Sequence, residues 1–90
     1  MSIKDLFQTI YSLTRSGLEV LRSNPDEKAI RRWINYSIEV INIATQKNQP
    51  TIAISYMQLV LDLDAKKIPA TNQLSACLDF LLEVLNRLKE

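Results

Sequence analysis

Residues 25–46 read PDEKAIRRWINYSIEVINIATQ, and this segment has the strongest helical pattern in the chain. When successive residues are placed at intervals of about 100°, the polar side chains fall on one stripe roughly 100° wide. That stripe contains Lys28, Arg31, Arg32, Asn35, Glu39, Asn42 and Gln46. Nearly all of the remaining arc, roughly 220°, is apolar, which is about twice the apolar arc of an ordinary surface helix. We therefore expect a helix that has to be covered on more than one side.

The same periodicity predicts three more helices. The first begins at Ser2, where Asp5 completes a variant of the capping box, and it has an apolar arc of roughly 180°. The third extends from about Pro50 to Lys66, with a thin polar stripe and an apolar arc of roughly 220°. The fourth follows the loop 67–72 and has an apolar arc of roughly 200°. The second and third helices are therefore both more apolar than surface helices need to be.

Short polar segments that contain prolines separate these helices. Asn24 is expected to cap the second helix, with the following proline in its first turn and Glu27 completing a capping box. Thr71 or Asn72 is expected to cap the fourth helix. Short links of this kind make consecutive helices antiparallel. We predict a single all-α domain, residues 1–90, in which four antiparallel helices form an up-down bundle.

The only glycine of the chain, Gly17, falls inside the apolar arc of the first helix. A glycine at such a position lowers helix stability by about 1 kcal/mol relative to alanine. The favoured explanation is that a neighbouring helix approaches closely at this point. A functional kink is the alternative.

The composition is typical of a folded protein. The 90 residues are 47% hydrophobic and carry a net charge of +1, spread evenly along the chain, which argues against disorder and against a strongly basic nucleic-acid binder. The N-terminus lacks the apolar run of a signal peptide, and no segment reaches the ~20 apolar residues that span a bilayer. The sole cysteine, Cys77, cannot form an internal disulfide, which fits a reducing compartment. We expect a cytoplasmic protein that does not enter the membrane.

Residues suited to catalysis or metal binding are scarce. Histidine, the commonest general base and metal ligand, is absent, and one cysteine cannot build a zinc site. Asp62 and Asp64 diverge by roughly 160° on a helix, so they cannot share a proton or a water molecule. Cys77 falls on the apolar side of the fourth helix, where a buried and inert thiol is expected. We predict a non-enzymatic protein without cofactor, metal or small-molecule substrate.

The main basic cluster consists of Lys28, Arg31 and Arg32, together with Arg22 across the first link. Arginine binds phosphates and carboxylates well, so these residues are candidates for contact with an anion or an acidic partner. The favoured interpretation is a solvated face, because any soluble helix has to expose such a stripe. An acidic protein partner and nucleic acid are the alternatives. Nucleic acid is the least favoured, because the third helix is too apolar to lie against phosphates.

The excess of apolar surface is the main indication of function. In a four-helix bundle each helix needs to hide a stripe only somewhat over 100° wide, so a chain this short cannot enclose both of its most apolar helices. An apolar patch left exposed is typical of a binding site or an aggregation hazard. We expect a two-fold symmetric homodimer that completes the bundle. The alternative is an adaptor or chaperone whose groove receives an amphipathic helix of another protein.

The candidate interface residues lie on the flanks of the second and third helices. They are Tyr36, Ile38, Ile54, Tyr56, Met57 and Leu61. Aromatic residues and methionine are enriched at protein interfaces. Trp33 is expected in the core instead, where a helical bundle also needs large side chains.

Overall fold

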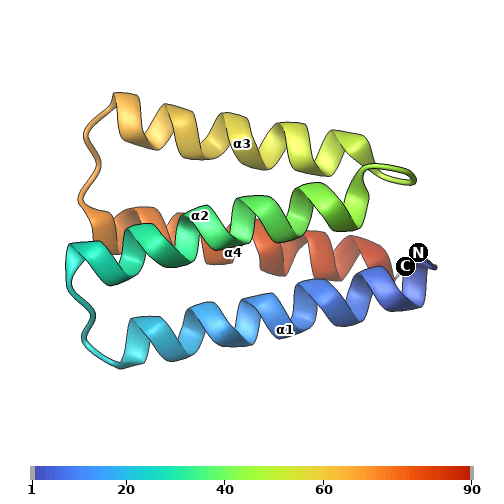
Figure 1. Ribbon diagram of the computed structural model, residues 1–90, viewed down its shortest axis with the longest axis horizontal. Coiled ribbons are helices and arrows are strands. Elements are labelled where there is room, and N and C mark those ends of the chain that lie inside the picture. Colours follow the sequence, from blue (N-terminus) through green and yellow to red (C-terminus); the bar gives the residue numbers. More distant parts are fainter. Residues whose placement is uncertain (1, 90) are drawn as a thin grey trace.

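The computed structural model describes residues 2–89, which form four α-helices. Their bounds are α1 (Ile3–Arg22), α2 (Glu27–Thr45), α3 (Pro50–Ala65) and α4 (Ala70–Lys89). The helices pack against one another, and the predicted all-α class is confirmed. Figure 1 shows that each loop joins adjacent ends of two consecutive helices.

The four helices do not occupy equivalent places. α2 and α4 contact each other and both remaining helices, whereas α1 and α3 make no contact with each other. Figure 1 accordingly shows α1 and α3 at opposite edges of the molecule, with α2 and α4 between them. Each outer helix therefore rests on the same two central helices and leaves its far side uncovered.

The core is formed mainly by α1, α2 and α4. Its fully buried apolar side chains in these helices are Leu6, Ile10, Leu13, Ile30, Trp33, Ile34, Ile41, Ala44, Leu74, Cys77, Leu78, Leu81, Val84 and Leu85. α3 adds only Tyr56 to this set. The expected core position of Trp33 is confirmed, and its ring Nε1 donates a hydrogen bond of 3.0 Å to the hydroxyl of Ser16. The indole is thus buried without losing a polar partner.

At Gly17 α1 lies very close to neighbouring helices, and the favoured explanation of this glycine is confirmed. A Cβ atom at this position would lie 2.5 Å from Cδ2 of Leu78 and 2.6 Å from Cζ2 of Trp33. Contacts this short do not occur between carbon atoms in well-packed proteins, because they lie far inside the van der Waals minimum. The absence of a side chain therefore lets α1 settle against Trp33 and α4.

Replacing Gly17 by alanine is expected to destabilise the fold by about 1–3 kcal/mol, because the new methyl group has to displace Trp33 or Leu78. This loss outweighs the gain of about 1 kcal/mol that alanine brings to an exposed helix. Urea denaturation followed by circular dichroism measures the change. The control, Gln8→Ala on the exposed side of α1, should alter stability by less than about 0.5 kcal/mol. A Gly17→Ala protein at least as stable as wild type would contradict the close approach.

Two of the four predicted helix starts are wrong and two are confirmed, and one of the confirmed starts is that of α3 at Pro50. Ser2 caps α1 as expected, its hydroxyl accepting a 3.1 Å hydrogen bond from the backbone N–H of Asp5. α2, however, begins after Asp26, whose Oδ1 accepts a 2.8 Å bond from the N–H of Ala29. Asn24 instead has a φ of 54°, the left-handed conformation that asparagine tolerates better than most residues and that turns the chain out of α1.

The start of α4 also differs from expectation. The helix begins at Ala70, so Thr71 and Asn72 lie inside its first turn rather than at a cap. The carbonyl of Pro69 accepts the first helical bond, 2.9 Å from the N–H of Gln73. The Gln73 side chain turns back and donates a 2.8 Å bond to the carbonyl of Ile68. This glutamine ties the loop to the helix, a role that a search for short capping side chains does not reveal.

Candidate functional site

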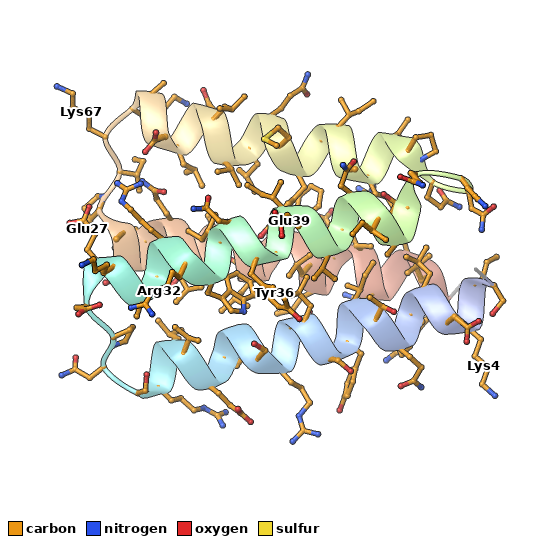
Figure 2. All side chains as sticks on the ribbon, viewed as in Figure 1. Lys4, Glu27, Arg32, Tyr36, Glu39 and Lys67 are labelled. Carbon is orange, nitrogen blue, oxygen red and sulfur yellow. The ribbon has the colours of Figure 1, made fainter. Side chains whose placement is uncertain are left out.

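The uncovered side of α3 is an apolar stripe. Ile54, Met57 and Leu61 are 57%, 39% and 60% exposed. Their spacing of three and then four residues places them on one face of the helix, in the pattern of a coiled-coil seam. No charged residue stands between them on this face. We call these three residues the α3 stripe. Figure 2 shows side chains along the edge of α3 projecting away from the other helices.

α1 occupies the corresponding outer place and does not have such a stripe. Its exposed side chains are predominantly polar or charged, and they include Lys4, Asp5, Gln8, Ser12, Arg15, Glu19 and Arg22. Its exposed large apolar residues are Ile3, at the first turn, and Tyr11, which stacks on Phe7 with ring centroids 6.3 Å apart. A helix at the edge of this fold therefore does not need an apolar outer face. The apolar outer face of α3 needs its own explanation.

Tyr56 faces the opposite way from the α3 stripe, and its prediction as an interface residue is wrong. It is 1% exposed, and its ring lies against Phe80 with centroids 5.3 Å apart. The phenol oxygen lies 2.6 Å from Oγ of Ser37. Because the Ser37 hydroxyl donates its own hydrogen to the carbonyl of Ile34, 2.6 Å away, the phenol donates to Ser37. Tyr56 is the residue that anchors α3 to α2 and α4.

The polar groups at this anchor are held in their neutral forms. Burial is the main reason why the pKa of Tyr56 is raised, and the neighbouring Cys77 raises it further. Burial also raises the pKa of the Cys77 thiol, with the Tyr56 hydroxyl opposing part of that shift. The expected burial of Cys77 is confirmed, and a thiol held protonated is a poor nucleophile.

These raised pKa values predict a loss of stability at alkaline pH. In the unfolded chain the thiol and phenol ionise near their ordinary values of about 8.5 and 10, whereas in the folded protein they stay protonated. The contribution of these two protonated groups to the free energy of unfolding is therefore fully present below about pH 8.5. It declines as the pH rises further. Urea midpoints at neutral and alkaline pH measure the decline. Tyr56→Phe should show a smaller decline than wild type, and an identical decline would contradict the role of the phenol.

The remaining predicted interface residues lie in two different places. Ile38 is half-buried and lines a groove between α2 and α3, beside Met57 and Leu61. Tyr36 is 56% exposed but lies on the other flank of α2, where it lines a hollow shared with α1. Figure 2 shows Tyr36 on the side of α2 that faces α1, and Glu39 on the side that faces α3. The structure thus separates Tyr36 from the other exposed candidates.

Ile43 is an exposed apolar residue that is not among the predicted interface residues. It is 72% exposed, the largest exposed fraction among the large apolar residues of residues 2–89. It lies seven residues after Tyr36 and therefore on the same side of α2. That spacing is the signal that would have linked the two residues.

The groove between α2 and α3 has a volume of about 580 Å³ and is apolar at its base. Its apolar lining consists of Ile34, Ile38, Met57, Val60 and Leu61. Asn35, Gln73 and the charged residues Arg31, Glu39 and Asp64 complete the lining. The groove is continuous with the α3 stripe, because Met57 and Leu61 belong to both.

The predicted basic cluster is partly neutralised. Arg31 lies 3.1 Å from the carboxylate of Glu27 and 3.4 Å from that of Asp64, and these contacts raise the pKa of its guanidinium. Arg22, Lys28 and Arg32 are exposed, and no ion pair joins them to another residue of 2–89. Asp62 is paired with Lys66 at 3.0 Å, so the two aspartates of α3 have different partners, as their divergence predicts.

Two further kinds of feature, a metal-binding cluster and a membrane-spanning helix, are not found within residues 2–89. This part of the chain brings together no group of three or more carboxylate and thiol side chains suited to a metal ion. None of its helices combines the length and the apolar character needed to cross a membrane.

Comparisons with protein-family models, curated proteins and solved structures find no match to this chain.

Proposed function

We propose that this chain is a non-enzymatic protein–protein interaction module that acts as a homodimer through the α3 stripe. In this proposal the four helices form an up-down bundle that a second copy completes. The observation that carries it is the contrast between the two outer helices. α1 presents a predominantly polar face to the outside, whereas α3 presents Ile54, Met57 and Leu61 and fully buries only Tyr56.

The amount of exposed apolar surface is consistent with a reversible dimer. The α3 stripe offers on the order of 300 Å² per subunit, so a symmetric contact would cover roughly 600 Å². This area is about half that of an ordinary stable interface, which covers roughly 1,200–2,000 Å². Because small interfaces are typical of weak and transient contacts, we expect reversible association with a dissociation constant on the order of micromolar or weaker.

The groove between α2 and α3 supports a second candidate function, the binding of an amphipathic helix from another protein. Its apolar base and charged rim, with Arg31, Glu39 and Asp64, match what such helices need. A dimer that covers the α3 stripe would also narrow access to this groove, because Met57 and Leu61 are shared. The two functions therefore predict opposite behaviour of the isolated protein.

The behaviour of the isolated protein in solution distinguishes these two functions. A homodimer predicts that binding of a hydrophobic fluorescent dye falls as the protein concentration rises through the micromolar range, while the molar mass doubles. A helix receptor predicts dye binding per chain that does not depend on concentration, and an unchanged mass. Light scattering and dye titration on the same samples give both quantities.

Contact with nucleic acid through the basic cluster is the weaker alternative. Arg31 already bonds to two carboxylates, which lowers the positive charge that the cluster can offer to a phosphate group.

A cytoplasmic location is part of our proposal, because the only cysteine is buried and unpaired, as in proteins of reducing compartments.

A further inference from the structure

We propose that α3 is a movable cover, which detaches as a unit while α1, α2 and α4 stay packed together, and which then uncovers an apolar channel between α2 and α4. This inference does not depend on the proposed homodimer. It follows from how little of α3 is buried, from the contacts that remain when α3 leaves, and from the length of chain that links α2 to α4.

Of the four helices, α3 buries the fewest residues. Tyr56 is its one fully buried residue, whereas α1 has five and α2 and α4 have seven each. Ile52, Ala53 and Val60 are only partly buried against the core, and the α3 stripe is exposed before any opening takes place. Transfer of apolar surface to water is the main term that opposes detachment of a helix, and this term is smallest for α3.

The polar contacts of α3 add little to this small apolar contact. The hydroxyls of Tyr56 and Ser37 form a buried hydrogen bond, but both groups regain water when the helix leaves, so the bond opposes opening only modestly. The ion pair of Arg31 with Asp64 joins two half-exposed side chains, and such surface pairs contribute little to stability. At the N-terminal end of α3, the side chain of Gln49 forms no capping hydrogen bond.

The other three helices keep their mutual contacts when α3 leaves. α1 packs on α2 and α4 and makes no contact with α3, which lies at the opposite edge of the molecule (Figure 1). The hydrogen bond from Trp33 to Ser16 and the close approach at Gly17 involve only α1, α2 and α4. The cluster of fully buried apolar side chains loses Tyr56 alone. The three remaining helices therefore retain a core of their own.

The chain between α2 and α4 is long enough for α3 to move. Residues 46–69 comprise α3 and the links on both sides of it, 24 residues in all. A segment of this length reaches up to ~80 Å when it is extended, whereas the longest dimension of the molecule is 35 Å. α3 can therefore swing away or unwind without pulling α2 and α4 apart.

Opening changes which apolar surface the protein presents. The walls of the uncovered channel come from α2 and α4 and comprise Ile34, Ile38, Phe80 and Val84. Cys77 is fully buried in α4 and neighbours the hydroxyl of Tyr56, so departure of α3 removes its cover. In the open form the α3 stripe is replaced by this channel, and the only thiol of the chain becomes reactive.

The thiol of Cys77 provides a direct measurement of the opening. The wild type is treated with N-ethylmaleimide at several urea concentrations below its unfolding transition, at a protein concentration well below micromolar, so that no second copy covers α3. Mass spectrometry gives the alkylated fraction. Opening of α3 predicts alkylation at least about tenfold faster than global unfolding allows, with a urea slope about one third of the global slope, because the slope scales with the surface exposed. Alkylation with the rate and the slope of global unfolding would overturn the inference.

Two matched variants test whether the opening belongs to α3. Tyr56→Phe removes a hydrogen bond between α3 and α2, whereas Ser16→Ala removes one between α1 and α2. Tyr56→Phe should speed alkylation about fivefold, and Ser16→Ala should leave its rate unchanged. Acceleration by both variants in proportion to their loss of global stability, or by neither, would contradict the detachment of α3.

Amide hydrogen exchange identifies the helix that opens. The amides of α3 should be protected at least about tenfold less than those in the middle of α1, α2 and α4, and they should respond together as urea is raised. Protection in α1 equal to or lower than that in α3 would show that α3 is not the movable helix.

Discussion

Replacing Tyr56 by alanine is expected to remove about 3–5 kcal/mol of stability. Tyr56 is the only side chain of α3 that is fully buried, and it packs on Phe80 and bonds to Ser37. Its loss would leave a cavity where α3 inserts its one fully buried side chain into the core. Because domains of this size are stable by only about 5–15 kcal/mol, the variant is expected to unfold at low urea concentration or to detach α3.

The matched control for this change is Tyr56→Phe, which keeps the ring and removes the hydroxyl. It is expected to lose only about 1 kcal/mol, since Ser37 still donates its hydrogen to the carbonyl of Ile34. Urea denaturation followed by circular dichroism compares both variants with wild type. A Tyr56→Ala protein within about 1 kcal/mol of wild type would show that α3 is held by other contacts.

Replacing Leu61 by glutamate is expected to abolish dimerisation and leave the fold intact. Leu61 is 60% exposed in the single chain, so a carboxylate there remains solvated. In the dimer the same carboxylate would be desolvated without a partner, and symmetry introduces it twice. We expect the dissociation constant to rise by at least about a hundredfold, which corresponds to roughly 2.7 kcal/mol. Sedimentation equilibrium gives this constant, and circular dichroism reports the fold.

Leu82→Glu provides the control for the change at Leu61. Leu82 is an exposed leucine of α4, 44% accessible, and it lines a hollow between α4 and α1, away from α3. The same apolar-to-acidic change at this position should leave dimerisation as it is in wild type. Dissociation by Leu82→Glu, with Leu61→Glu still dimeric, would transfer the interface to the α1–α4 side.

The positions of the helices were predictable because the spacing of polar residues is local information. A helix has to expose its polar face, so the stripe from Lys28 to Gln46 was enough to locate α2 within two residues at each end. The cap at Ser2 was predictable for the same reason. The choice between Asn24 and Asp26 was not, because it depends on how the chain leaves α1, and the left-handed turn occupies Asn24.

The direction in which α3 faces was beyond what the sequence pattern contains. When apolar residues cover roughly 220° of a helix, its wheel does not show which part is core. Tyr56 and Ile54 were equally acceptable as interface residues by type and position. What separates them is the hydroxyl of Ser37 and the ring of Phe80, which the fold brings to Tyr56 from two other helices. The excess of apolar surface was predictable, and Ile54, Met57 and Leu61 were selected correctly as exposed residues, but the pattern did not show that Tyr56 faces the core.

The most direct test of the proposed interface is the molar mass of the wild-type chain in solution as a function of concentration. A single chain has a mass of 10.3 kDa. Multi-angle light scattering across the micromolar range should show a rise from this value to twice this value, with a midpoint that Leu61→Glu moves to much higher concentration. A mass of one chain at every concentration, for a protein that remains folded, would contradict the claim that a second copy covers α3.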